Sequence, residues 1–517
     1  MQILPIGEQN FRKIREEDML YVDKTEHIHR LITSGRYYFF SRPRRFGKSL
    51  TLSTIAEIFR GNRQIFEGLW IEKNWDWTKT HPVVSIPFNR IGYSELGLEQ
   101  ALIGVILENA KQHGIALEAA KPGLMLRELI LKLAEVQTPA VLLIDEYDKP
   151  LIDYLEKEDL HIAKAHRKIL KAFYGTLKDS ESQAALRLLL ITGVSKFSQV
   201  SIFSDLNYLT DITLHKQFAQ LVGYSQAELE HNFADYILQT LRESDVAETR
   251  EQLLEAIRDW YNGYSWDGVT SVYNPFSILL FFSHQQFQNF WFKTGTPTFL
   301  IRLLKERHFF NFHNVRVSEA VFESYDLENL ETRSLLFQTG YLTIKKIEPD
   351  QRYILGYPNR EVEAAMYNHL IAAFGEGSPL DSSEPVFHLR DALYADDLEQ
   401  VIRIVNSLFK NIPSLHFARQ SEFLYHALLH LTFHYLGVFI DSEVHTSDGR
   451  IDAVVHTPNC IYLLEFKLDE SADAALRQIR EKGYAEKYRL HGKPIIGVGI
   501  NFSSAKKAVD DWTQEVL

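Results

Sequence analysis

The sequence has little cysteine, no long apolar run and no excess of positive charge. Its 517 residues include one cysteine, Cys460, which rules out an intramolecular disulfide and favours a reducing compartment. No apolar run approaches the roughly 18 residues that span a bilayer. The first residues also lack the charged-then-apolar pattern of a secretory signal. We therefore expect a cytoplasmic protein without membrane contact.

The net charge of −12 argues against a protein coated with nucleic-acid-binding surface, because phosphate backbones attract positive charge. Any contact with DNA must come from local basic patches. The content of 45% hydrophobic and 24% charged residues is that of a folded globular protein. The chain is too long for one ordinary core, so at least two domains are expected.

Periodicity divides the chain into α/β, helical and mixed regions. Up to about residue 215, short apolar runs alternate with amphipathic segments, which predicts a largely parallel sheet. The predicted strands are 36–41, 82–89, 140–146 and 186–194. A helical pattern follows to about residue 290, with a turn signal at 261–268. Residues 332–357 predict a helix and a hairpin, which fits a winged helix or a structural hairpin. A helical stretch from about 385 to 435 follows, and a strand-rich second α/β unit completes the pattern.

The stretch SRPRRFGKSL, residues 41–50, ends like a phosphate-binding loop. Gly47, Lys48 and Ser49 supply the last three positions of the G-x-x-x-x-G-K-[ST] pattern, between a predicted strand and a predicted helix. In such loops the lysine reaches the phosphates, the hydroxyl ligates Mg²⁺ and the helix N-terminus favours anions. Arg42 stands where the pattern has its first glycine. The alternative is therefore a basic surface loop.

Two acids follow the third predicted strand, in the stretch AVLLIDEYD. Asp145 can hold the Mg²⁺ shell, and Glu146 can orient or deprotonate an attacking water. Such a pair could instead cap a helix. However, loop and acids occur in the right order with one strand, 82–89, between them, and Thr192 at the end of the fourth strand is suited to sensing the γ-phosphate. Together these features predict binding of ATP with Mg²⁺.

The last part of the chain places three further groups on two consecutive strands. Asp452 begins one strand, and Glu465 and Lys467 share one face of the next, because they are two residues apart. A turn at 456–459 would bring Asp452 to Glu465. Carboxylates clustered on Mg²⁺ with a lysine nearby are what phosphodiester cleavage requires. The pattern D-x12-E-x-K is the signature of PD-(D/E)XK nucleases, although a solvent-facing strand pair would also explain it.

A predicted helix before these strands carries Glu422, His426, His430 and His434 at intervals of four. The segment HALLH has the spacing of the H-E-x-x-H zinc motif, but Ala427 replaces the essential glutamate, which argues against a metalloprotease. A partly solvated helix face is the simpler interpretation of the histidines. Glu443 is a further candidate acid.

Seven segments resemble one known family. YVDKT (21–25), SRPRRFGKSL, LLIDEYDKPL and TGVSKFSQVSIF are similar to segments of bacterial AAA-ATPase-like proteins with a carboxy-terminal PD-(D/E)XK nuclease-like domain. WYNGY, VYNPFSI and TGYLTI extend the resemblance over nearly the whole chain. The resemblance implies that an arginine-rich loop is usual and that YVDKT lies near the nucleotide. It also implies that Glu422 completes the metal site and that Gln478 lines it.

We therefore expect an α/β fold with an additional-strand, AAA-like P-loop ATPase domain, a helical and winged-helix-like middle, and a C-terminal PD-(D/E)XK nuclease-like domain. The expected parts are an ATPase domain 1–215, a helical lid 216–290, a winged-helix-like region 291–380, a helical linker 381–415 and a nuclease-like domain 416–517. The candidate nucleotide contacts are Arg44, Arg45, Phe46, Gly47, Lys48, Ser49, Leu50, Asp145 and Thr192. The candidate metal ligands are Ser49, Asp145, Glu422, Asp452 and Glu465. The candidate catalytic residues are Glu146, Asp452, Glu465, Lys467 and Gln478.

The leading functional hypothesis joins the two halves. ATP binding, with hydrolysis, would regulate or power a Mg²⁺-dependent DNA endonuclease domain. A second hypothesis is a non-cleaving, signal-transducing NTPase whose C-terminal domain only binds nucleic acid or a protein partner. A third is an ATPase with a structural tail. An arginine that assists hydrolysis could come from another subunit, so a homo-oligomer is compatible with the first hypothesis.

Overall fold

The structure, a computed structural model, divides into two compact units. The first consists of Met1–Gly295 and Phe312–Glu361, and the second of Thr296–Asn311 and Val362–Leu517. The residues that the structure describes are 1–156, 158–196, 202–203, 206–291, 300–301, 303–304, 307, 312, 314–323, 331–375, 379–410, 431–432, 434–436, 442–444, 451–506 and 508–517. The finer domain boundaries expected from the sequence stay predictions.

A five-stranded parallel sheet forms the centre of the first unit. Its strands are β1 (Tyr37–Ser41), β2 (Val83–Pro87), β3 (Ala140–Asp145), β4 (Leu186–Gly193) and β5 (Thr210–Asp211). Their spatial order is β2-β3-β4-β1-β5, and every neighbouring pair is parallel. The four predicted strands and their parallel arrangement are confirmed. The two-residue β5 was not predicted, because so short a strand leaves no pattern in the sequence.

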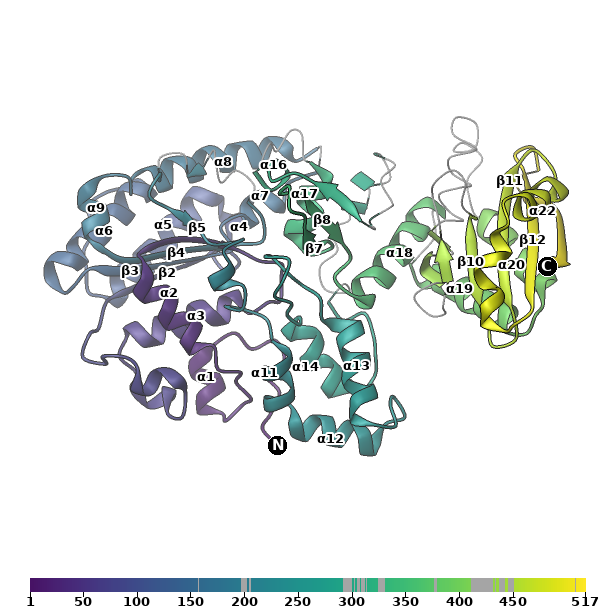
Figure 1. Cartoon of the computed structure of the whole chain (residues 1–517). Helices are drawn as coiled ribbons and strands as arrows, with labels where there is room; N and C mark the ends of the chain where they lie inside the picture. Colours follow the sequence, from purple (N-terminus) through teal and green to yellow (C-terminus); the bar gives the residue numbers. More distant parts are fainter. Residues whose placement is uncertain are drawn as a thin grey trace. The chain divides into compact units, whose positions relative to one another are not determined.

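Helices cover both faces of this sheet, which is why its strands are continuous apolar runs. As Figure 1 shows, one face carries α5 (Leu98–Gln112), α6 (Pro122–Val136) and α8 (Leu160–Gly175), and the other carries α1 (Phe11–Glu16), α2 (Thr25–Ser34) and α3 (Lys48–Phe59). Leu126, Ile130 and Leu170 are fully buried in the core between α6, α8 and the sheet. The shorter elements are α4 (Tyr93–Leu96), α7 (Lys149–Ile152), α9 (Ser180–Ala184), η1 (Arg63–Phe66), η2 (Trp70–Lys73) and η3 (Lys216–Phe218).

The region that the sequence predicts to be helical, about 216–290, contains four α-helices. They are α11 (Gln226–Asn232), α12 (Ala234–Glu243), α13 (Arg250–Tyr261) and α14 (Pro275–His284). Ser225 and Thr249 form capping boxes at the starts of α11 and α13, which fixes where these helices begin. The turn predicted at 261–268 is present, and a β-bridge between Tyr264 and Val272 closes it.

The remainder of the first unit is a small antiparallel sheet. It contains β6 (Val315–Val317), β7 (Thr343–Ile347) and β8 (Tyr353–Gly356) in the order β6-β8-β7, beside α16 (Ala320–Glu323) and α17 (Thr332–Thr339). The helix and hairpin predicted within 332–357 are therefore present. Their assignment to a winged helix stays a prediction.

The second unit combines helices with a mixed sheet. The helices are α18 (Arg360–Gly375), which begins at the end of the first unit, α19 (Pro379–Tyr394), α20 (Leu398–Lys410), α22 (Ala472–Glu481) and the 3-10 helix η5 (Tyr484–His491). The strands are β9 (Ser442–Val444), β10 (Ala453–His456), β11 (Ile461–Leu468), β12 (Ile495–Ser503) and β13 (Ala508–Val516). They are ordered β13-β12-β11-β10-β9, and only β11 and β12 are parallel.

Helix α22 packs closely on this mixed sheet. Leu476 and Ile479 of α22 are buried with Leu463 of β11 and Ile495 of β12. At Gly499 of β12, an added Cβ would lie 2.1 Å from the carbonyl oxygen of Ala472. A glycine is therefore needed there for the helix to approach the strand. Across the described residues of both units, none of the helices has the length and apolar character that a membrane crossing requires.

Candidate nucleotide and metal sites

The loop between β1 and α3 has the backbone geometry of an anion-binding turn. Arg45 and Gly47 have φ angles of 69° and 93°, in the left-handed region that glycine adopts most readily. Gly47 is the N-cap of α3, and no described side chain caps this helix end. The N–H groups of Lys48, Ser49 and Leu50 open the helix, so they can donate to an anion that the helix dipole also favours.

Lys48 is nearly fully buried at this loop. Its Nζ donates hydrogen bonds to the carbonyl oxygens of Arg42, at 2.8 Å, and Pro43, at 2.9 Å. Burial lowers the pKa of Lys48, and the nearby carboxylates of Glu146 and Asp145 act in the opposite direction. Since its direct partners here are neutral carbonyl groups, a phosphate would be a stronger partner for this ammonium.

Asp145 brings together three of the predicted residues. Its Oδ2 accepts a hydrogen bond of 2.5 Å from Ser49 Oγ, and its Oδ1 accepts one of 2.6 Å from Thr192 Oγ1. The strand order explains the meeting, because β4, which carries Thr192, lies between β1 and β3. The strand 82–89 instead lies on the outer side of β3, as β2. Carboxylate and hydroxyl oxygens are ligands that suit Mg²⁺, so this donor set fits the ion.

Glu146 follows Asp145 in an unusual backbone conformation. Its φ is 53°, which is uncommon for a residue with a side chain and occurs mainly where the fold imposes it. Burial raises the pKa of Glu146, and the Lys48 ammonium opposes that rise. The carboxylate therefore lies within electrostatic range of the Lys48 ammonium.

The arginine that replaces the first glycine is a structural group. The side chain of Arg42 is buried, and its Nη1 donates to the carbonyl oxygens of Ser41, at 2.9 Å, and Thr213, at 2.7 Å. Its guanidinium stacks 3.9 Å from the ring of Trp266, a cation–π contact. Burial lowers the pKa of Arg42 to about 9. This side chain thus links the loop to the residues after β5 and to the turn at 261–268.

Two other side chains of the turn, those of Arg45 and Phe46, also pack against aromatic residues. Phe46 is buried with its ring 4.7 Å from that of Tyr264, so it can contribute to phosphate binding only through its backbone. The guanidinium of Arg45 lies 4.6 Å from the ring of Phe276. These aromatic partners were not predicted as part of the site, although Tyr264 lies in the segment WYNGY and Phe276 in the segment VYNPFSI.

Asp148, another residue that was not predicted as part of the site, links the chain after β3 to the residues after β4. It is buried, and its carboxylate accepts hydrogen bonds from Val194 N at 3.1 Å, Ser195 N at 2.6 Å and Ser195 Oγ at 2.7 Å. These bonds fix the residues that follow Thr192. The final aspartate of the stretch DEYD, residues 145–148, was the sequence signal that could have identified Asp148.

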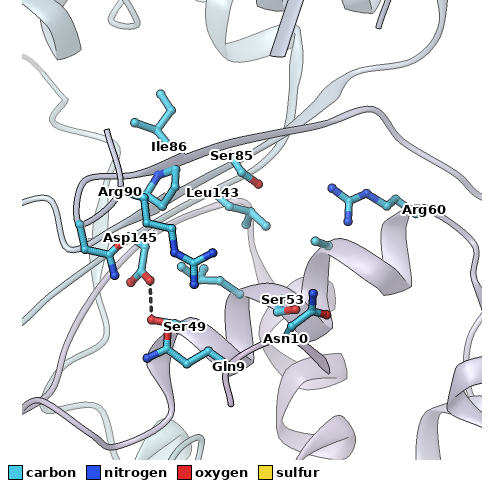
Figure 2. Close-up of a pocket in the computed structure, with 14 residues that line it drawn as sticks. Gln9, Asn10, Ser49, Ser53, Arg60, Ser85, Ile86, Arg90, Leu143 and Asp145 are labelled. Atoms are coloured by element: carbon cyan, nitrogen blue, oxygen red, sulfur yellow. Dashed lines mark hydrogen bonds between the residues drawn. The ribbon is translucent and has the colours of Figure 1, made fainter. Parts of the chain in front are cut away.

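A cavity of about 210 Å³ opens beside the Ser49–Asp145 pair (Figure 2). It lies along α3, between that helix, the ends of β2 and β3, and the residues before α1. Its polar lining residues are Gln9, Asn10, Ser49, Ser53, Arg60, Ser85, Asn89, Arg90 and Asp145. The Ser49–Asp145 pair is therefore accessible from an open, polar space.

In the second unit, three predicted residues form one hydrogen-bonded chain. Gln478 of α22 donates from Nε2 to Glu465 Oε1 on β11, and its Oε1 accepts a bond of 2.7 Å from Lys467 Nζ. Asp452, just before β10, accepts a bond of 2.8 Å from Phe466 N. Since Phe466 directly follows Glu465, this bond holds Asp452 beside Glu465, as the predicted hairpin requires.

The charge state of Glu465 depends on its neighbours. The residue is 2% exposed, and burial together with the charge of Asp452 raises the pKa of Glu465 to about 7. Its Oε2 is buried and has no hydrogen-bond partner among the described residues. A buried carboxylate oxygen without a donor is costly unless a cation satisfies it. This oxygen therefore fits a divalent metal ion.

The remaining predicted ligand, Glu422, lies outside the described residues, as do His426 and His430. Within the described part of the chain, no group of three or more His, Cys, Asp or Glu side chains is arranged to hold a metal. Glu443 has its backbone in β9, paired with Val454. His434, which was expected on a partly solvated helix face, is half-buried, and its ring stacks on that of Tyr367 with centroids 5.5 Å apart.

Comparisons with known proteins agree with both units. The family described as "Predicted AAA-ATPase" matches residues 5–203, and the "PD-(D/E)XK nuclease superfamily" matches residues 420–512. A protein of Azotobacter chroococcum mcd 1, described as "Uncharacterized protein in vnfD 5'region", is 39% identical over 531 residues, covering 99% of both chains. No solved structure gives a significant match.

The parallel sheet with its glycine–lysine–serine loop fits a P-loop ATPase, and the C-terminal mixed sheet fits a nuclease-like domain. The chain belongs to the bacterial AAA-ATPase-like family that carries a C-terminal PD-(D/E)XK nuclease-like domain. Domains of these two kinds generally use a nucleotide and a divalent metal.

Proposed function

We propose that this protein binds and hydrolyses ATP with Mg²⁺, and that its nucleotide state regulates or powers a Mg²⁺-dependent DNA endonuclease domain. The observation that carries the ATP half is the meeting of Ser49 and Thr192 on the two oxygens of Asp145. The nuclease half rests on the buried, unpartnered oxygen of Glu465 beside Asp452. DNA is the proposed partner and the cytoplasm the proposed location.

In the first unit, the N–H groups at the start of α3 and the Lys48 ammonium hold the phosphates. Ser49 and Asp145 hold Mg²⁺, which neutralises charge on the phosphate oxygens when bound. Glu146 orients the attacking water and accepts its proton. Because burial raises the pKa of Glu146, this carboxylate is a better proton acceptor than an exposed one. Thr192 contacts the same oxygen cluster from β4.

In the second unit, Asp452 and Glu465 hold Mg²⁺, with Glu422 as the proposed third ligand. The ion supplies Lewis-acid stabilisation of the scissile phosphate when bound. Lys467 places a positive charge at the attacking water or the phosphate. Gln478 bonds both Glu465 and Lys467, so it fixes the spacing of the carboxylate and the ammonium.

The alternative function is a non-cleaving NTPase switch. Only two carboxylates of the C-terminal site are described, and α17 with the β6-β8-β7 sheet is compatible with a winged-helix-like region that binds nucleic acid. In that case DNA would bind without being cut, and nucleotide state would change binding only.

One experiment separates these functions. The full chain is incubated with Mg²⁺ and plasmid DNA under three conditions, with ATP, with ADP and without nucleotide, beside the Lys48→Ala variant. We expect cleavage by the wild type that depends on nucleotide, and cleavage by the variant that does not respond to it. DNA binding without cleavage would favour the switch. Unchanged ATP affinity in Lys48→Ala, measured by calorimetry, would contradict the ATP site.

A further inference from the structure

Arg90 shares a cavity with the proposed metal-binding pair. It follows β2 and lines the same space as Ser49 and Asp145. In Figure 2 its guanidinium points into this cavity on the side of the Ser49–Asp145 hydrogen bond. No motif in the sequence identified this residue.

The backbone of Arg90 is fixed relative to Asp145. Pro87 pairs with Asp145 in the sheet, and Phe88 N donates a hydrogen bond of 3.0 Å to the carbonyl oxygen of Asp145. A further bond of 2.9 Å, from Arg90 N to the Pro87 carbonyl oxygen, turns the chain directly after the strand. Backbone hydrogen bonds therefore hold the Cα of Arg90 close to the end of β3. The position of this Cα does not depend on a long loop.

Three of the other arginines near the site, Arg42, Arg45 and Arg60, are already engaged. Arg42 donates to two backbone carbonyl groups and stacks on Trp266. Arg45 stacks on Phe276, and Arg60 forms a 2.7 Å ion pair with Glu57. A fourth, Arg44, is half-buried in the loop before α3, and its carbonyl oxygen accepts a hydrogen bond of 3.0 Å from Trp291 Nε1. The guanidinium of Arg90 forms no ion pair or side-chain hydrogen bond with the described residues, and the residue is exposed. It is thus a cation whose donors can meet a ligand in the cavity.

We propose that Arg90 contacts the terminal phosphate of ATP from its own chain. This inference rests on the proposed ATP site. A phosphate chain held by the start of α3 and by Lys48 would end beside Ser49 and Asp145, and Arg90 lines the same cavity next to that pair. A guanidinium there adds charge-assisted hydrogen bonds to a group that ATP has and ADP lacks. Hydrolysis then needs no arginine from a second subunit.

The proposal is tested by nucleotide affinity, with Arg90→Ala and Arg90→Lys compared with the wild type. Calorimetry would measure the binding of ATPγS and of ADP, both with Mg²⁺. We expect Arg90→Ala to weaken ATPγS binding by about 10- to 100-fold, the strength of a charged hydrogen bond, with ADP affinity unchanged. Arg90→Lys should recover part of the loss, because it keeps the charge without the planar fork.

A matched control is Arg60→Ala, which removes a guanidinium from the same cavity. Arg60 lies at the far end of α3, about 16 Å along the helix from Ser49, and is paired with Glu57. The control should bind both nucleotides like the wild type. If Arg90→Ala binds ATPγS as tightly as the wild type, or loses ADP affinity equally, the proposal is wrong.

Turnover supplies a second readout. Arg90→Ala should lower kcat for ATP, and the wild-type kcat per subunit should not change with protein concentration. A kcat that rises with concentration, or that is restored by mixing Arg90→Ala with Lys48→Ala chains, would assign the contact to a neighbouring subunit and overturn the proposal. If the wild type binds neither nucleotide, the ATP site itself is wrong, which is a distinct result.

Discussion

Among the described residues, each unit has one buried glutamate whose pKa is raised to about 7, but the two glutamates differ in their hydrogen bonds. In the first unit, Glu361 accepts a bond on each oxygen, from Ser277 Oγ at 2.7 Å and from Trp291 N at 2.6 Å. In the second unit, Glu465 accepts from Gln478 on one oxygen, and its other oxygen has no donor among the described residues.

This difference shows that a raised pKa does not by itself identify a functional acid. Burial is the first cause of the shift in both residues, and it would act in the same way on a structural group. What distinguishes Glu465 is the second carboxylate, Asp452, and the oxygen that lacks a donor. Glu361 joins the segment at Trp291 to the start of α18, whereas Glu465 has one oxygen left for a cation.

The strongest test of this contrast is Glu465→Gln. The change keeps the shape of the side chain but removes the charge that would bind a metal. We expect Mg²⁺-dependent DNA cleavage to fall by more than about 100-fold, since even loss of an outer-shell partner costs up to about that much. The measurement is a plasmid-nicking time course, with the exposed Glu481→Gln as the control. Cleavage at the wild-type rate would remove Glu465 from the catalytic site.

Ser277→Ala should give Glu361 the unpaired oxygen that Glu465 has. The variant removes the hydroxyl that donates to Glu361 Oε2, so a buried carboxylate is left partly unsatisfied. We expect the free energy of unfolding to fall by about 2 kcal/mol at pH 8, and by less at pH 5, where Glu361 is protonated. Urea denaturation at both pH values measures this. Ser271→Ala is the control, because its hydroxyl donates to the neutral Asn262 and the residue is exposed. An equal loss at both pH values would contradict the assigned role of Glu361.

Strands and the residues at their ends could be predicted from the sequence, because apolar runs and turn residues are local signals. The acids after β3 and the D-x12-E-x-K pattern follow such strands, so their grouping was predictable once the strand pairing was guessed. Asp452, Glu465, Lys467 and Gln478 are brought together as expected. The resemblance to a known family made the unusual Arg42 loop interpretable as a nucleotide site.

Contacts between distant segments could not be predicted in this way. Trp266 covers Arg42 across more than 200 residues of sequence, and no periodicity links the two. Arg90 looks like an ordinary loop residue until the pairing of β2 with β3 places it beside Asp145. Hydrogen-bond satisfaction, which separates Glu361 from Glu465, is likewise a property of packing that no local pattern records.

Gln478→Ala should weaken the second site without removing a ligand. Gln478 bonds both Glu465 and Lys467, so its loss frees two groups that must keep a fixed spacing. We expect cleavage at limiting Mg²⁺ to fall about tenfold, the lower range for outer-shell partners, with partial recovery at high Mg²⁺. A Mg²⁺ titration of the cleavage rate measures this. A defect that Mg²⁺ does not relieve would mean that Gln478 acts directly on DNA.

The smallest expected effect is the pH dependence that Glu361 gives to stability. Its pKa rises from an ordinary value of 4.5 to about 7 in the folded state, because burial disfavours the charge. Below about pH 4.5 both folded and unfolded chains carry the proton, and this contribution to stability is complete. As the pH rises towards 7, the unfolded chain loses the proton first, so stability falls.

The Glu361→Gln substitution removes this pH-dependent contribution to stability. Compared with the variant, the wild type should lose about 1 kcal/mol of unfolding free energy between pH 5.5 and pH 6.5. Urea denaturation of both proteins at closely spaced pH values isolates the difference, because all other titrating groups are shared. Parallel stability curves would show that Glu361 is ionised throughout, and its two hydrogen bonds would then be outweighing its burial.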